Sequence, residues 1–195
     1  MPLIDMHIHI QPRSACSYLT GKQLLRNISH QLNGVCITDH FRVEPDPYLQ
    51  NATYGMEFKV FFGVEITARE GDLLAYGISQ IPSRNMPAKS IIKQIHDEGG
   101  IAVCAHPFSP HHCAFGDKIY EYNFDAVEIN GGIGKKYNKS AKMAAEIMDL
   151  PTIGGSDAHS ADDLNTMCTL FKTRINTLDD IIEAIKKGQC RPKHL

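Results

Sequence analysis

Histidines and acidic residues stand directly after short apolar runs at several places in this chain. The motif DMHIH occupies residues 5–9, TDH residues 38–40, AHPF residues 105–108 and SDAH residues 156–159. Parallel strands that end on the same side of a sheet bring such residues together although they are far apart in sequence. We therefore expect these side chains to converge, because imidazole and carboxylate groups gathered in one place are typical of a metal site.

His7 and His9 are separated by one residue, so on a strand both side chains point to the same face. Two imidazoles placed in this way can bind one ion, and Asp5, which shares their face, is positioned to orient one of them. A histidine pair in a strand is also common at surfaces and in packing, and Asp5 fits an ordinary polar residue at a strand end. The pair therefore indicates a metal site only in combination with the other clusters.

Two further apolar runs carry ionisable groups. Asp39 and His40 end the run that begins at Val35, where both would be costly unless they are solvated or paired, for example with a metal. An equally simple interpretation is that Asp39 caps a turn and that His40 is a loop histidine. Glu65 lies inside the sequence FFGVEIT, and because a buried glutamate is rarely unpaired, we expect a partner beside it.

The last two clusters repeat this pattern. His106 follows the run Ile101–Ala105, and Pro107 prevents further strand pairing. Asp157 and His159 are two residues apart and share a face if the chain is extended there. So many ligand-type groups at strand ends favour two or three metal ions over independent structural roles. Imidazoles and carboxylates without an obligatory thiolate suit Mn²⁺, Fe²⁺ or Zn²⁺ better than Ca²⁺ or a structural zinc site.

The elements that position these residues alternate between strands and helices. Short apolar runs predict strands at Leu3–Ile8, Val35–Thr38, Val60–Ile66, Leu73–Ile78, Ile101–Ala105, Ala126–Ile129 and Thr152–Gly155. Helical periodicity marks Thr20–Gln31, Pro87–Glu98, Lys139–Met148 and the segment from Thr177 to Gly188. Strand ends that carry ligands favour an α/β barrel over an open doubly wound sheet, which remains an alternative. We expect one domain, residues 1–195, with the loops Arg42–Gly55 and Ser109–Asp117 over the site.

The composition narrows the possible partners. Twenty basic and twenty-two acidic residues give a formal charge of −2, so we expect no broad cationic surface for nucleic acid or an anionic membrane. The six cysteines include no C-x-x-C pair, which favours reduced thiols. We find neither an export signal nor eighteen consecutive apolar residues, and therefore expect a cytoplasmic protein that is not inserted in a membrane.

In order and spacing, the motifs of this chain resemble those of the polymerase and histidinol phosphatase (PHP) superfamily of metal-dependent phosphoesterases. The motifs are DMHIHI, GVCITDH, GVEIT, GGIAVCAHPF, DAVEIN and IGGSDAH, followed by LDDIIEAIKKG, and they span nearly the whole sequence. The resemblance implies a distorted seven-stranded (β/α) barrel with up to three metal ions. It also implies a first metal held by four residues, namely His7, His9, Glu65 and Asp157. Glu65 would bridge to a second metal that also takes His106, and His40 and His159 would bind a third.

Two positions depart from the commoner pattern of that superfamily. After the first motif, relatives often supply a carboxylate or a histidine to the third metal, whereas this chain offers Ser14 or Cys16 as the nearest substitute. On the fourth strand many relatives place a histidine for the second metal, and here Asp72 stands in that position. An aspartate still binds a hard divalent ion, so we include Asp72 among the predicted ligands.

Groups that could bind a phosphate or donate a proton lie in the loops. Four basic residues follow strand ends, namely Arg13, Arg42, Lys135 and Lys136. We favour Arg42 because it lies two residues beyond the proposed ligand His40, although such cations are often solvated surface charges. His111 and His112 are candidate general acids, since a histidine can carry a proton near pH 7, or ordinary residues of a solvated loop. Asn130 is placed either to contact substrate or to close a turn.

The residues predict hydrolysis, and together with the resemblance to the PHP superfamily they lead us to expect a metal-dependent phosphoesterase. Its substrate would be a small phosphomonoester or nucleotide, with a metal-bridging hydroxide as the nucleophile. No glycine-rich dinucleotide or phosphate-loop motif competes with this interpretation. One alternative is an amidohydrolase-type carbonyl hydrolase, which usually needs a bridging lysine where this chain has Glu65. Another is a noncatalytic metal-binding regulatory domain, as occurs where PHP domains accompany polymerases.

Overall fold

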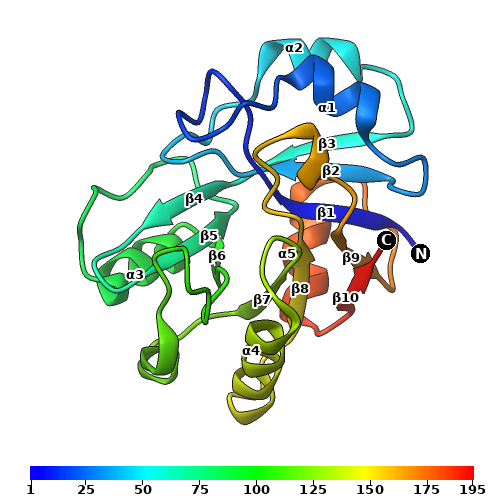
Figure 1. The fold of residues 1–195 in the computed structure, drawn as a ribbon. Coiled ribbons are helices and arrows are strands. Elements are labelled where there is room, and N and C mark those ends of the chain that lie inside the picture. Colours follow the sequence, from blue (N-terminus) through cyan, green and yellow to red (C-terminus); the bar gives the residue numbers. More distant parts are fainter.

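The structure is a computed structural model that describes all of residues 1–195. Two five-stranded sheets form the frame of the protein (Figure 1). The first sheet has the order β10-β9-β1-β2-β3, and the second has the order β4-β5-β6-β7-β8. The strands of the first sheet are β1 (Leu3–Ile8), β2 (Gly34–Ile37), β3 (Lys59–Phe62), β9 (Met167–Phe171) and β10 (Cys190–His194). Those of the second are β4 (Val64–Thr67), β5 (Asp72–Tyr76), β6 (Ile101–Cys104), β7 (Ala126–Asn130) and β8 (Thr152–Gly155).

Both sheets mix parallel and antiparallel pairs. In the first, β1, β2 and β3 are parallel, whereas β9 runs antiparallel to both β1 and β10. In the second, β6, β7 and β8 are parallel, whereas β5 runs antiparallel to β4 and β6. The carboxyl ends of the parallel strands therefore carry most of the predicted ligands on one side of the molecule.

The two sheets meet at two junctions. At the first, β3 and β4 are separated by Gly63 alone, and a Cβ atom at this glycine would lie 2.6 Å from the Tyr76 ring. At the second, the carboxyl end of β1 lies beside the segment that follows β8, where Asp157 N donates to His7 O at 2.8 Å and His9 N donates to Ala158 O at 3.0 Å. These junctions bring residues of both sheets to one place.

Five α-helices cover the sheets. They are α1 (Gly21–Asn27), α2 (Pro47–Ala52), α3 (Ala88–Asp97), α4 (Lys135–Ile147) and α5 (Leu178–Lys186), and two short 3₁₀ helices lie at Gly116–Glu121 and Ala161–Asp163. Figure 1 shows α1 and α2 above β2 and β3, and α3 beside β4, β5 and β6. Thr20 and Thr177 are the N-cap residues directly before α1 and α5, each in a capping box that satisfies free amide groups of the first turn. None of these helices combines the length and hydrophobicity that a membrane span requires.

Side chains from strands of both sheets pack in a common core that α5 covers. Met6 from β1, Phe61 from β3 and Leu74 from β5 belong to this core, and Ile181 and Ile185 contribute the apolar face of α5. A second core lies under α3 and α4 against the second sheet. Burial of these apolar surfaces holds the strand ends in fixed positions.

The mixed α/β fold predicted from the sequence is confirmed, whereas the seven-stranded barrel is not, because the strand ladders form two sheets of five. All seven predicted strands are present, with Val60–Ile66 divided at Gly63 into β3 and β4. The prediction missed β9 and β10. The segment Arg42–Gly55, predicted as a loop, contains α2, and Ser109–Asp117 has no regular structure before residue 116.

Gly155 at the end of β8 is packed so closely that an added methyl group is expected to destabilise the protein. A Cβ atom there would lie 2.4 Å from His7 Cβ and 2.9 Å from Glu128 Oε1. We expect Gly155→Ala to lower the free energy of unfolding in urea by about 1–3 kcal/mol, the usual cost of overpacking. Gly134→Ala is the matched control, because the nearest atom to its added Cβ lies 3.6 Å away. An equal effect of both substitutions would contradict the packing seen here.

Candidate metal centre

The structure brings all eight predicted ligands together. Side chains that could hold a metal form four overlapping groups, and within each group the candidate ligand atoms lie within 4.8 Å of one another. The groups are His7–His9–Glu65, Glu65–Asp72–His106, His106–His112–Asp157 and His9–Cys16–His40–His159. Residues from both sheets and four loops therefore meet at the carboxyl ends of the parallel strands, and their role as metal ligands stays a prediction.

His7 and His9 lie at the centre of this arrangement and are completely buried. Their Nε2 atoms face each other at 3.0 Å. Two carboxylates adjoin the pair: Glu65 Oε2 lies 3.1 Å from His9 Nε2, and Asp157 Oδ1 lies 3.3 Å from His7 Nε2. All four groups point toward one small volume, as ligands of a single ion would.

The partners on the far side of the two rings determine which nitrogen faces the centre. His7 Nδ1 lies 2.8 Å from Glu128 Oε1, and because a carboxylate only accepts, this nitrogen carries the proton. His9 Nδ1 lies 3.3 Å from Ser14 Oγ, whose own proton is donated to Asp39 Oδ1 at 2.8 Å, so His9 also donates from Nδ1. Both Nε2 atoms then present lone pairs to each other, an arrangement that a bound cation stabilises. The residues thus fit a divalent metal.

The buried carboxylates around His7 and His9 favour a positive charge at the centre of this group. Burial by itself lowers the pKa of His7, but Asp157, Glu128 and Glu65 outweigh it and raise this pKa well above its ordinary value. Burial tends to raise the pKa of Glu65, and the charge on His7 with hydrogen bonds from neighbouring histidines lowers it well below its usual range. Metal binding would replace the protons that otherwise balance the carboxylates.

Glu65 connects this group to a second one. Its Oε1 atom lies 3.1 Å from His106 Nε2, on the opposite side of the carboxylate from His9. Asp72 Oδ1 and His106 Nδ1 are buried and have no hydrogen-bond partner. Burial, followed by the charge of Glu65, raises the pKa of Asp72 to about 6. A buried carboxylate oxygen without a donor fits a metal ligand, so Asp72 is suitably placed where relatives carry a histidine.

Two of these residues have unusual backbone conformations. The φ angles of His106 and Asp157 are 28° and 57°, in the left-handed region that residues with a Cβ rarely adopt. Such strain persists where the surrounding structure imposes it, and it is concentrated at functional sites. Here it turns the two side chains inward at the ends of β6 and β8.

The two candidate general acids lie in different positions. His112 stacks on His106 with 4.6 Å between ring centroids, and its Nε2 lies 3.9 Å from Asp157 Oδ2. His111 is exposed and belongs to none of the ligand groups. The loop therefore brings only His112 to the candidate metal centre.

The candidate phosphate-binding cations are also unequal. Arg13 is not free, because its guanidinium donates to Asp39 Oδ2 at 2.6 Å and to Glu44 O at 2.6 Å. Arg42 is exposed and forms no ion pair. Lys135 and Lys136 are exposed in the first turn of α4. Arg42 remains the predicted cation nearest in sequence to a ligand.

Glu128 is a functional candidate that the sequence prediction missed. It is completely buried, and besides His7 it accepts hydrogen bonds from His106 N at 2.8 Å and Asn130 Nδ2 at 3.1 Å. Asn130 also donates to Asp157 Oδ2 at 3.2 Å, so it contacts a predicted ligand rather than only closing a turn. The available signal was an acidic residue inside the apolar run DAVEIN, the same signal that pointed to Glu65.

Two other acidic residues hold the backbone around the centre. Asp39 accepts hydrogen bonds from Ile10 N at 2.8 Å and from Ser14, and it belongs to none of the ligand groups. Asp5 accepts from His7 N at 3.2 Å and Ser156 N at 2.9 Å, and burial raises its pKa to about 7. Both carboxylates therefore position the strand ends.

Sequence comparisons match part of the chain. A family model described as PHP-associated matches residues 135–190. An uncharacterized protein of Methanocaldococcus jannaschii is 28% identical over 95 residues, which cover 49% of this chain and 56% of that protein. The match thus spans only about half the length of this curated relative.

Solved structures share the fold over most of the chain. PsfC from Pseudomonas syringae is 18% identical with a TM-score of 0.73, covering 100% of this chain and 91% of that chain. The lesion-specific endonuclease EndoQ from Pyrococcus furiosus is 19% identical with a TM-score of 0.71, covering 98% and 57%. A structure assigned as a metal-dependent phosphoesterase from Bifidobacterium adolescentis is 17% identical with a TM-score of 0.63, covering 80% and 87%. The family match is thus confined to residues 135–190, and the likeness to these solved structures shows a shared fold over most of the chain.

Proposed function

We propose that this chain is a metal-dependent phosphoesterase that hydrolyses a small phosphate ester, either a phosphomonoester or a nucleotide. The observation that carries the proposal is the position of Glu65. Its Oε2 atom faces His9 at 3.1 Å and its Oε1 atom faces His106 at 3.1 Å, so one carboxylate lies between two groups of ligands. A carboxylate so placed can hold two ions close together, as in enzymes that hydrolyse phosphate esters at two-metal sites.

The predicted cofactors are two or three divalent ions, Mn²⁺, Fe²⁺ or Zn²⁺. When bound, they would polarise phosphoryl oxygens and make a water molecule acidic enough to supply the nucleophile. Around them, His112 at the rim is placed to give a proton to the leaving alcohol, and its exposed fraction of 35% leaves it open to substrate. Arg42 is the proposed cation for phosphate oxygens.

The family and structural neighbours described above include a phosphoesterase and an endonuclease, which are hydrolases. A small substrate is proposed for this chain because twenty basic residues against twenty-two acidic ones leave no excess of positive charge for nucleic acid. We also propose a single catalytic domain over residues 1–195 and a cytoplasmic location. We also propose that β1 to β8 form a distorted seven-stranded barrel in which β3 and β4 count as one strand interrupted at Gly63. The Ile8–Ala158 bridge between the ends of β1 and β8 supports its closure, and β9 and β10 extend one of the two sheets.

The proposal can be tested with the purified protein, supplied with Mn²⁺ and assayed on p-nitrophenyl phosphate and bis(p-nitrophenyl) phosphate. We expect hydrolysis by the wild type and its loss in His7→Ala and Asp157→Ala, which remove buried ligands. His30→Ala is the matched control, since His30 is exposed and lies outside the ligand groups. Equal inactivity of the wild type and both variants, with metal bound, would favour a noncatalytic domain. Hydrolysis of an amide in place of the phosphate esters would favour the amidohydrolase alternative.

A further inference from the structure

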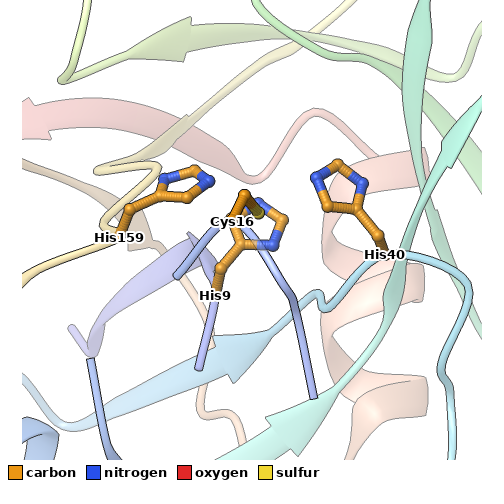
Figure 2. A group of neighbouring side chains, drawn as sticks. All are labelled: His9, Cys16, His40 and His159. Atoms are coloured by element: carbon orange, nitrogen blue, oxygen red, sulfur yellow. The ribbon is translucent and has the colours of Figure 1, made fainter. Parts of the chain in front are cut away.

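One group of potential ligands contains a thiol. Cys16 lies with His9, His40 and His159, and the candidate ligand atoms of the four residues are within 4.8 Å of one another. Figure 2 shows the rings of His40 and His159 on either side of Cys16 and His9, each turned toward the middle of the group. The four residues come from three connecting segments. His9 and Cys16 lie between β1 and α1, His40 follows β2, and His159 follows β8. We refer to these four residues as the Cys16 group.

We propose that the Cys16 group binds a divalent ion through the Cys16 thiolate, and that this ligand makes the site selective for Zn²⁺ over Mn²⁺. This proposal adds a third ion to the metal centre proposed above, and it rests on the proposed function for the two ions beside it. The loop that carries Cys16 contains neither an acidic residue nor a histidine between Ile10 and Gly21, so it offers no carboxylate or imidazole ligand for this ion.

Ser14, the other candidate in this loop, is already engaged. Ser14 is 1% exposed, and its hydroxyl donates to Asp39 Oδ1 at 2.8 Å and accepts from His40 N at 3.1 Å. It also lies 3.3 Å from His9 Nδ1, where it fixes the orientation of that ring. With its donor and acceptor positions in use, Ser14 supports the group from outside, and Cys16 is the loop side chain left to bind an ion.

The histidines of the Cys16 group are oriented for binding. His159 Nδ1 lies 2.8 Å from Asp157 O and donates its proton there, which leaves a lone pair on Nε2. The His9 ring lies between the other two, with centroid distances of 4.7 Å to His40 and 4.4 Å to His159. His9 also belongs to the buried group with Glu65, so Cys16, His40 and His159 are the ligands that only this group supplies.

The loop holds Cys16 in place before any ion binds. The next residue, Ser17, donates from its hydroxyl to His9 O at 2.9 Å and also lies 3.1 Å from His159 O. Tyr18 N donates to His159 O at 2.8 Å, and the Arg13–Asp39 ion pair at 2.6 Å fixes the other end of the loop. Cys16 is therefore tied to the same backbone segments that carry His9 and His159, which lowers the entropic cost of bringing its thiolate to a metal.

The thiolate determines the preferred ion. Zn²⁺ accepts thiolate and imidazole ligands in a tetrahedral arrangement, whereas Mn²⁺ prefers carboxylate and other oxygen ligands. One thiolate and two or three imidazoles form a set that suits zinc and leaves a position open for water or substrate. The buried groups around Glu65 contain only imidazoles and carboxylates, so the two parts of the centre should select different ions.

The test measures metal content and absorption, and it does not use hydrolysis. Full-length protein is stripped of metal with a chelator and titrated with Zn²⁺, Mn²⁺ or Co²⁺, the last because thiolate ligation of cobalt produces a near-ultraviolet charge-transfer band. We expect wild type to bind one more equivalent of Zn²⁺ than Cys16→Ser, and we expect both proteins to bind the same amount of Mn²⁺. The cobalt band should appear in wild type and be lost in Cys16→Ser. Cys113→Ser is the matched control, because Cys113 is the other exposed cysteine and lies outside the ligand groups.

A second variant keeps the proposal falsifiable if serine perturbs the loop. Cys16→Asp supplies an oxygen ligand, and we expect it to gain one equivalent of bound Mn²⁺ relative to wild type. An undiminished cobalt band in Cys16→Ser, or equal Zn²⁺ binding by wild type and both Cys16 variants, would overturn the proposal. If the zinc equivalent and the band depend on Cys16 while no phosphate ester is hydrolysed, the proposed function fails and the thiolate site stands.

Discussion

Replacing Glu65 with glutamine is expected to reduce phosphoesterase activity by about 10²- to 10³-fold, the cost of removing a group that stabilises charge in a transition state. The carboxylate lies within 3.1–3.5 Å of nitrogens from four histidines, which are His7, His9, His40 and His106. Glutamine has nearly the same shape but no charge. The glutamine amide would also point N–H donors toward either the His7–His9 pair or His106. A glutamine therefore cannot bind an ion on each side, as the carboxylate can.

The measurements for this variant are kcat/KM on p-nitrophenyl phosphate and the metal content of the purified protein. We expect Glu65→Gln to lose metal together with activity, while its circular dichroism stays that of the wild type. Glu57→Gln is the matched control, because Glu57 is exposed and is not among the metal-ligand candidates. Full metal content and activity in Glu65→Gln would show that Glu65 does not bridge the two groups.

Replacing Glu128 with glutamine is expected to weaken metal binding by about 10- to 100-fold, although Glu128 is not itself a proposed ligand. One Glu128 oxygen accepts from His7 Nδ1 and the other from His106 N, both at 2.8 Å. A glutamine can place its oxygen on only one side, so its amide group would face the other donor. If that donor is His7 Nδ1, the ring must take the opposite tautomer, and the lone pair on Nε2 is lost.

A positioning role for Glu128 predicts that raising the metal concentration restores activity in Glu128→Gln but not in Glu65→Gln. Metal affinity is measured by titration with a competing chelator, and the tautomer of His7 by the nitrogen chemical shifts of its ring. Glu121→Gln serves as the control, since Glu121 is exposed at the end of a 3₁₀ helix. An unchanged metal affinity with altered stability alone would assign Glu128 a purely structural role.

Much of this arrangement follows from local sequence. The apolar runs identify seven strands, because a buried strand needs only a short stretch of apolar residues and the structure has each of them. The position of His7 and His9 on one face follows from the two-residue period of a strand. The common direction of parallel strands then predicts that groups at their ends meet, and all eight predicted ligands do lie together.

Other features depend on contacts between distant segments. β10 reads CRPKH, whose polar residues and proline suggest no strand, yet it forms at a sheet edge where β9 offers it a partner. The choice between Ser14 and Cys16 depends on Asp39, which is brought beside Ser14 by the pairing of β1 with β2. The same aspartate pairs with Arg13 and removes it from the candidates for phosphate binding.

The sequence by itself thus determined the seven apolar strands, the α/β class of the fold and the residues that can act as ligands, since these depend on residue type and short-range period. Tertiary structure alone decided which nitrogen of His7, His9 and His159 faces the centre, because Glu128, Ser14 and the Asp157 carbonyl hold the opposite nitrogens. It also decided that Cys16 joins the histidines, since a loop side chain is located only by what its neighbours bind. A proton or a lone pair at each ring depends on a partner far away in the chain, which no local pattern specifies.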